Sequence, residues 1–299
     1  MHLDGAIVLA GAIVGFAVGL TGMGGGALMT PVLVLFLHVQ PAAAVSSDLV
    51  ASVFMKPVGG AVHLRRRTVH LQLAKWLCLG AVPAAFAGAW FLHLFADGKS
   101  LENVVKWALG SALLVAVVGL VARALTSGSQ PPATPERFPA VRVVPTIIVG
   151  VVGGFIVGMT SVGSGSLMIV ALMFLYPTLT GGQLVGTDLV QSVPLVGAAA
   201  LGQLIFGDVQ FALTTSLLLG AMPAVYLGAK LSSMAPTGLL RGAIGVMLLL
   251  SGLKLVEVSN SVLAVSGAAA ALAVVAVWAL RARRRTIRSG ELRPEGVVV

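Results

Sequence analysis

Apolar segments separated by short polar or glycine-rich breaks run along almost the whole chain. A hydrocarbon core about 30 Å thick needs roughly 20 helical residues to cross, and most of these segments come close to that length. In lipid, backbone groups must find their hydrogen bonds within the protein, which favours helices. The sequence therefore predicts an all-α polytopic membrane protein, with segments at 5–21, 27–39, 42–64, 71–95, 103–125, 142–160, 166–176, 184–206, 210–232, 238–256 and 261–280.

Composition and charge support a membrane protein and argue against nucleic acid as a partner. Charged residues make up 10% of the chain, against roughly 25% in soluble domains. The net charge is +9, but six of the nineteen basic residues lie in the C-terminal tail and three more form the run at 65–67. Short basic runs beside apolar spans are typical of cytoplasmic loops. The lone Cys78 and five scattered histidines show no metal-ligand spacing, so we expect no metal and no other cofactor.

Three sequence blocks occur twice, in the same order and at nearly the same offset. GFAVGLTGMGGGALMT at 15–30 matches GFIVGMTSVGSGSLMI at 154–169 in nine of sixteen positions. SDLVASV at 47–53 then matches TDLVQSV at 187–193, and GAVPAAFAGA at 80–89 matches GAMPAVYLGA at 220–229. The chain therefore contains an internal duplication, and we expect two repeats of about five helical segments each.

An odd number of segments in each repeat predicts that the second repeat is inverted relative to the first. With the C-terminus in the cytoplasm, fifteen basic residues fall on the cytoplasmic side and three on the other, as the positive-inside rule requires. Inverted repeats with the site at their interface are typical of secondary transporters. The expected parts are a first transmembrane repeat at 1–125, a cytoplasmic linker at 126–141, a second repeat at 142–257, a final transmembrane helix at 258–281 and a basic cytoplasmic tail at 282–299.

Two of the apolar segments are too short to cross a bilayer. The segments at 27–39 and 166–176 would span about 20 Å and about 17 Å at 1.5 Å per residue. Each follows a glycine-rich turn, TGMGGG at 21–26 or TSVGSGS at 160–166. We interpret each pair as a broken or re-entrant hairpin whose tip lies within the membrane, such that the two tips meet near the midplane.

Hairpin tips of this composition are suited to binding an anion. Amides at a helix N-terminus lack internal partners and carry partial positive charge, while glycine lets the backbone approach a ligand closely. The alternative is that the glycines only let helices pack closely. The predicted substrate-binding residues of the two tips are Thr21, Gly22, Gly24, Gly25, Gly26, Thr160, Ser161, Gly163, Ser164, Gly165 and Ser166.

Three of the charged residues within the apolar segments are candidates for function. Lys56 is a candidate for attracting the anion, because charge at membrane depth is costly and often functional; alternatively, its long side chain extends to the cytoplasmic surface. Asp48 and Asp188 occupy duplicate positions, each after Ser or Thr. For both we favour helix capping over a role in proton coupling.

Two other classes of function stay open beside a secondary carrier. A passive anion channel or facilitator fits the same composition. An intramembrane hydrolase is weakly suggested by the GSGS run at 163–166, but every histidine lies in the first half of the chain, and a serine nucleophile needs a base in reach.

The repeated GF-x-VG-x-T-x-x-G-x-G-x-LM blocks at 15–29 and 154–168, with the DLV and GA-x-PA blocks, resemble the sulfite exporter TauE/SafE family of bacterial membrane transporters. The resemblance covers about 5–257. It implies a multi-pass protein of the bacterial inner membrane that exports sulfite, a sulfonate or a related small anion. Its expected partners are the lipid bilayer and that anion; the oligomeric state is unknown. One departure is that Ser161 and Ser164 replace glycine in the second tip.

Overall fold

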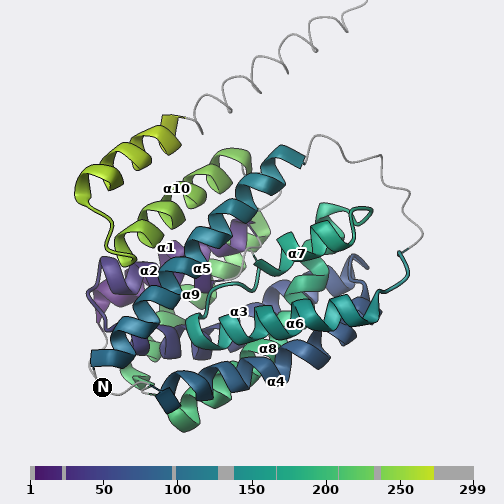
Figure 1. Cartoon of the computed structure of the whole chain (residues 1–299), viewed down its shortest axis with the longest axis horizontal. Coiled ribbons are helices and arrows are strands. Elements are labelled where there is room, and N and C mark those ends of the chain that lie inside the picture. The colour runs from purple at the N-terminus through teal and green to yellow at the C-terminus, as the bar shows by residue number, and fades with distance from the viewer. Residues whose placement is uncertain are drawn as a thin grey trace, which may run out of the picture.

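The structure is a computed structural model that describes residues 4–21, 25–95, 99–126, 138–165, 167–207, 209–231 and 237–272. Within these ranges the chain is helical and contains no strand, which confirms the predicted fold class. Figure 1 shows the helices in chain order. They are α1 (Gly5–Thr21), α2 (Gly26–Leu35), α3 (Pro41–Arg65), α4 (Leu71–Phe95), α5 (Lys99–Thr126), α6 (Val143–Thr160), α7 (Leu167–Leu175), α8 (Gly181–Phe206), α9 (Phe211–Leu231) and α10 (Thr237–Leu255).

The two short segments form the short helices that the sequence predicts. The helix α2 has 10 residues and α7 has 9, so they extend about 15 Å and about 14 Å, half of a hydrocarbon core. The helix α2 ends earlier than predicted, at Leu35 rather than residue 39, because the chain turns at His38 with a φ of 53° before Pro41 begins α3.

Equivalent helices of the two halves pack in reciprocal pairs. The helix α1 lies along α9, while α4 lies along α6, and α3 crosses α8. Small residues make these contacts close: a Cβ at Gly15 would lie 2.8 Å from backbone atoms of Ala221, and one at Gly154 would lie 2.7 Å from the Cα of Ala81. The helical glycines that precede each tip therefore let helices pack closely, as the alternative interpretation of the sequence predicts.

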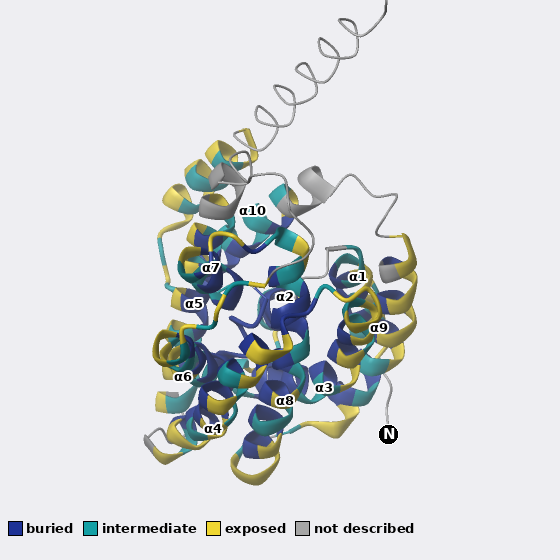
Figure 2. Ribbon diagram, turned by 90° about the vertical axis from the view of Figure 1, so that its right-hand side faces the viewer, coloured by how far each residue is buried: buried dark blue, intermediate teal, exposed yellow. Residues whose placement is uncertain are grey.

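The short helices and their tips lie at the centre of the protein. Figure 2 shows α2 among dark blue, buried segments of α3 and α8. Met29 and Leu33 of α2 are fully buried, and so is Leu172 of α7. Helices of both halves pack on α2, and residues 161–165 are buried, so the irregular backbone of the second tip is enclosed by protein.

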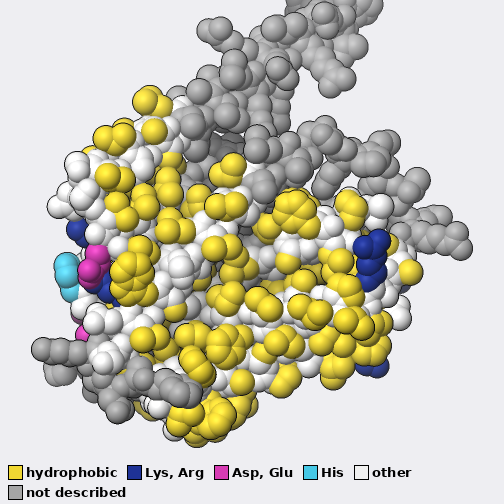
Figure 3. Space-filling view, viewed as in Figure 1, with side chains coloured by type: hydrophobic (Ala, Val, Ile, Leu, Met, Phe, Trp, Pro, Cys, Tyr) yellow, Lys and Arg dark blue, Asp and Glu magenta, His cyan; other side chains and the backbone are white. Residues whose placement is uncertain are grey.

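The outer surface is apolar and charged residues gather at its edges. In Figure 3 hydrophobic side chains cover most of the visible face, and the Lys and Arg side chains lie at two opposite edges. Exposed large side chains include Trp90, Phe174 and Leu204. In the described part of the chain, five helices are long and apolar enough to cross a membrane: Leu71–Leu94, Ser100–Val121, Val143–Thr160, Gly181–Phe206 and Phe211–Gly228. The surface matches a protein embedded in lipid.

The ends of the predicted parts fall partly outside the described residues. Most of the linker predicted at 126–141 lies there, and so does the tail at 282–299. The predicted final span at 258–281 is described only as the helix Asn260–Leu272. The predicted domain boundaries and the inversion of the second repeat stay predictions.

Candidate functional site

The two glycine-rich tips contact each other in the centre of the protein. A Cβ placed on Gly26, at the start of α2, would overlap the carbonyl oxygen of Ser161 and would lie 2.7 Å from its Oγ. Gly25, Gly26 and Ser161 are all buried. Only glycine at position 26 allows this approach, so the residue joins the two tips rather than standing open to solvent.

The second tip is a turn of unusual backbone conformation. Ser161 ends α6 in the left-handed region, with a φ of 59°, and Gly163 and Gly165 have φ values of 127° and 99°. Glycine adopts these angles at little cost, whereas a serine in the left-handed region is strained by about 1–3 kcal/mol. Ser161 replaces a glycine of the first tip at this point, so its hydroxyl must contribute something that a glycine cannot.

The Ser161 hydroxyl binds a buried carboxylate. It donates a hydrogen bond of 2.7 Å to Oδ2 of Asp48 on α3, and Thr30 of α2 donates to the same oxygen over 2.8 Å. Asp48 is fully buried. A single carboxylate oxygen therefore links α2 and the second tip to α3. Hydrogen bonds to a carboxylate are stronger when it is ionised than when it is neutral.

Lys56 reaches the same tip from the next turns of α3. Its side chain is 5% exposed, and its Nζ donates a hydrogen bond to the hydroxyl of Ser164. Lys56 also interacts electrostatically with Asp188 of α8 and, more weakly, with Asp48. Asp188 in turn accepts a bond of 3.0 Å from the Gln191 amide. The second tip is thus held at two points along α3, one acidic and one basic.

The backbone amides at the starts of the short helices are partly used within the protein. In α2 the amides of Leu28 and Met29 donate to the carbonyl of Gly25. In α7 the amides of Leu167 and Met168 both donate to the carbonyl of Gly163. The first-turn amides available to an anion are therefore fewer than the four that a free helix start offers.

Two buried polar atoms beside the first tip have no hydrogen-bond partner among the described residues. They are Oδ1 of Asp48 and Oγ of Ser52, one turn further along α3. Both lie within 4.0 Å of the position that a Cβ on Gly25 would occupy. Buried polar groups are nearly always bonded, so this pair marks a place where a proton or a small polar guest would be stabilised.

Sequence reasoning missed Thr30 and Ser52. Ser52 carried a usable signal, because the duplicated blocks both place Ser four residues after Asp, on the same face of a helix. Thr30 had none: its equivalent in the second half is Ile169.

The remaining predicted residues are placed as follows. The Thr160 hydroxyl donates to the carbonyls of Ile156 and Val162, so it shapes the turn rather than facing a guest. Thr21 ends α1, and its side chain is not described. Gly22, Gly24 and Ser166 lie outside the described residues.

Two of the alternatives raised by the sequence are wrong. Asp48 and Asp188 cap no helix, because α3 begins at Pro41 and α8 begins at Gly181 behind a capping box formed by Thr180, which places each aspartate well inside its helix. Lys56 does not extend to the cytoplasmic surface, because it is buried and bonded to Ser164. The sequence favoured capping for the two aspartates and left both interpretations of Lys56 open, and in each case the tertiary structure decided against the local interpretation.

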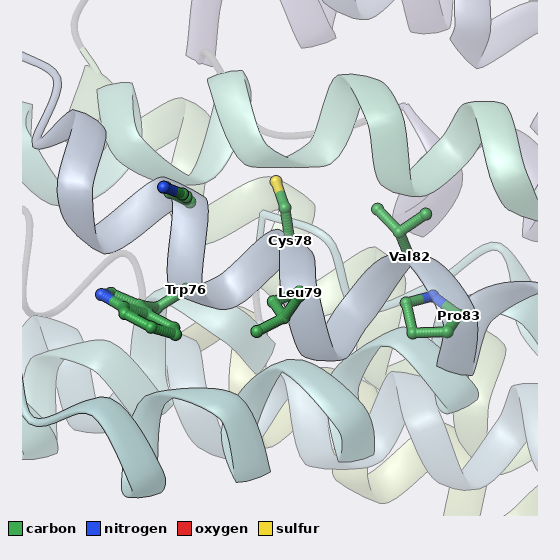
Figure 4. A pocket seen from close by; sticks show the side chains of 6 residues that line it. Trp76, Cys78, Leu79, Val82 and Pro83 are labelled. Atoms are coloured by element: carbon green, nitrogen blue, oxygen red, sulfur yellow. The ribbon is translucent and has the colours of Figure 1, made fainter.

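An open depression lies on the outer face of α4, apart from the tips. One helix lines it, with Lys75, Trp76, Cys78, Leu79, Val82 and Pro83 (Figure 4). Leu79 is 59% exposed, and the walls are almost wholly apolar. The depression fits a lipid chain better than an anion and contains none of the tip residues.

Comparison with known proteins gives a consistent result. The family model described as "Sulfite exporter TauE/SafE" matches residues 7–255. The chain is 39% identical to "Probable membrane transporter protein YjnA" of Bacillus subtilis (strain 168) over 253 residues, which cover 84% of this chain and 99% of the relative. It is 24% identical to the similarly described YdhB of the same organism over 250 residues, 83% of this chain and 98% of that one. No solved structure matches the chain significantly.

Proposed function

Because the chain belongs to the sulfite exporter TauE/SafE family of membrane transporters, we propose that it is a secondary carrier that exports a small anion, such as sulfite, a sulfonate or a related sulfur oxyanion. The observation that carries the proposal is the buried Lys56 bonded to Ser164 of the second tip. A buried cation on a glycine-rich turn favours a negative guest.

The proposed binding place lies between the two tips and beside Lys56. Positively polarised starts of α2 and α7 face this region, and the hydroxyls of Ser161 and Ser164 supply further donors. Gly22, Gly24 and Ser166 belong to the proposed site by sequence. Small oxyanions accept several hydrogen bonds at once, which a ring of amides, hydroxyls and one ammonium can satisfy.

Transport by this site requires the tips to move apart. In the described conformation Gly26 packs directly on Ser161, so an anion between them must separate the two halves. The reciprocal packing of α1 on α9 and of α4 on α6 supports a rocking of one half against the other. We place the protein in a bacterial inner membrane, with both tips near the midplane and the C-terminus in the cytoplasm.

Counterflow in proteoliposomes tests the carrier. Vesicles preloaded with unlabelled sulfite or thiosulfate should take up labelled anion faster than empty vesicles, because a loaded site returns more readily than an empty one. A channel gives no such acceleration, so equal uptake in loaded and empty vesicles would favour a channel over a carrier. A panel of sulfite, thiosulfate, sulfoacetate and taurine then identifies the substrate class.

A second function has one specific observation in its favour. Lys56 and Ser164 form the pair that a serine–lysine hydrolase uses, which supplies the base that the sequence lacked. Covalent labelling by a fluorophosphonate, lost in Ser164→Ala, would support hydrolysis. Ser164 is 3% exposed, which leaves no access for a substrate in this conformation and favours the carrier.

A further inference from the structure

The buried charges around the two tips do not balance. Among the described residues, the buried Asp, Glu, Lys and Arg side chains are Asp48, Lys56 and Asp188. If all three are ionised, the group carries one net negative charge in a water-poor region. An anion entering beside it would be repelled, because charges interact far more strongly there than in water. One proton would make the group neutral.

We propose that Asp48 is a proton-binding site, and that its proton is taken up together with the transported anion. The inference rests on the proposed carrier function and adds its coupling ion. The proton comes from whichever aqueous side the open tips face, binds to the carboxylate without any redox change, and leaves on the other side with the anion.

The geometry at Asp48 favours a proton on one particular oxygen. Oδ2 already accepts two hydroxyl hydrogens, from Ser161 and Thr30. Oδ1 has no described partner, and neither has the Ser52 hydroxyl beside it. A proton on Oδ1 gives this oxygen a hydrogen to donate, and a rotation of the Ser52 side chain brings an acceptor within reach. Oδ1 is therefore the oxygen of Asp48 that can take a proton while Oδ2 keeps both of its hydrogen bonds.

Asp188 is less suited to take the proton. Oδ1 of Asp188 already accepts the Gln191 amide, and of the two carboxylates it interacts more strongly with Lys56. Among the described side chains, the helices packed on α3 bring no further buried charge to Asp48: α2 has no titratable residue, and Lys230 of α9 and Glu102 and Lys106 of α5 lie outside the core. Lys56 and Asp188 thus balance each other and leave Asp48 as the uncompensated charge.

Proton binding would also loosen the contact between the tips. Hydrogen bonds to an ionised carboxylate are roughly twice as strong as those to a neutral one. The ionised Asp48 holds the Ser161 hydroxyl firmly and keeps Gly26 against Ser161. The neutral acid holds it less firmly and no longer repels an anion. Protonation of Asp48 therefore both weakens the contact between the tips and removes the repulsion of the anion.

The coupling is compatible with export. A divalent anion that travels with one proton carries one net negative charge. A membrane potential that is negative inside drives such a complex outward.

Thiosulfate is a suitable probe for the experiment, because it stays doubly charged around neutral pH, whereas sulfite itself takes up a proton there. Proteoliposomes containing the full chain, a pH-sensitive dye and thiosulfate are diluted into thiosulfate-free buffer with the membrane potential clamped. Efflux should make the lumen alkaline, with about one proton leaving per anion. A lumen that keeps its pH while labelled thiosulfate leaves would overturn the inference, and so would efflux that depends on sodium instead.

A variant identifies the residue. Asp48→Asn keeps a neutral hydrogen-bonding side chain but has no proton to release, so the thiosulfate that this variant carries should leave without any proton signal. The surface variant Glu257→Gln is the control and should keep both the thiosulfate efflux and the proton signal. A retained proton signal in Asp48→Asn would refute the assignment. If this variant does not fold, the lumen pH of the unaltered carrier still tests whether a proton leaves with each anion. Absence of thiosulfate counterflow in the unaltered carrier is a different failure, which would reject the sulfur-oxyanion carrier itself and the proton site with it.

Discussion

Gly26 and Ser161 are in contact, although they lie in different halves of the chain, and there is no space between them for even one additional carbon atom. A Cβ on Gly26 would overlap the Ser161 carbonyl oxygen, whereas a Cβ on the neighbouring Gly25 would make ordinary contacts, 3.5 Å from Met55 at the closest. Two adjacent glycines of one tip therefore have different roles, and substitutions can separate them.

Gly26→Ala should destabilise the folded protein and Gly25→Ala should not. We expect the first to lower the free energy of unfolding by about 1–3 kcal/mol, because the added methyl forces the tips apart. Gly25 has an ordinary φ of −57°, so alanine fits there. Melting temperatures of the two variants in detergent measure the difference. Equal behaviour of the two variants would contradict the contact described between the tips.

Ser161 should tolerate glycine better than alanine. Both variants lose the hydrogen bond to Asp48, which we expect to cost about 1.5–3 kcal/mol while the carboxylate is ionised. Glycine recovers about 1 kcal/mol or more of that cost, because it relieves the left-handed backbone at this position. The melting temperatures should therefore fall in the order unaltered chain, Ser161→Gly, Ser161→Ala. The reverse order of the two variants would show that the backbone at 161 is unstrained.

Lys56→Met should weaken anion binding by about tenfold or more, since it removes the one buried cation near the tips among the described residues. Lys75→Met is the matched control, because Lys75 is an exposed lysine on α4. Binding of sulfite to the purified protein, measured by protection against thermal unfolding, compares them. If Lys56→Met is as well protected as the control, the lysine has a structural role only.

Labelling of single cysteines tests the predicted inversion. In a Cys78→Ser background, cysteines replace Arg66 after α3 and Gln210 before α9, which are exposed positions near equivalent places in the two halves. Inverted repeats place them on opposite sides of the membrane. A membrane-impermeant maleimide should then label Gln210→Cys in intact cells and Arg66→Cys only after permeabilisation. Labelling of both from one side would exclude the inversion.

Element boundaries were the most predictable part of this protein. The segment predicted at 71–95 is α4, and the segment predicted at 166–176 is α7, within one residue at each end. Apolar runs in a membrane protein end where polar residues or glycine begin, so the sequence marks them directly. The two short helices were predictable for the same reason, whereas the position of the tips within the membrane stays a prediction.

The partners of the buried polar residues were much harder to predict. Local sequence suggested that Asp48 caps a helix, because Ser precedes it, yet α3 begins at Pro41 and the carboxylate binds Ser161 instead. Ser52 stands in the duplicated block and was overlooked, because a single serine in an apolar helix can simply hydrogen-bond a backbone carbonyl of its own helix.

The sequence by itself determined that this chain lies in a membrane, that it contains an internal duplication and that each half has one helix too short to cross a bilayer. Hydropathy and repetition can be read along the chain without knowing which residues meet in space. Only the tertiary structure decided that Gly26 packs on Ser161, that Asp48 binds α2 and the second tip, and that Lys56 turns inward to Ser164. These contacts join residues of opposite halves of the chain. The energy of a buried charge depends on the groups around it in space, and the sequence near that residue does not show which groups these are.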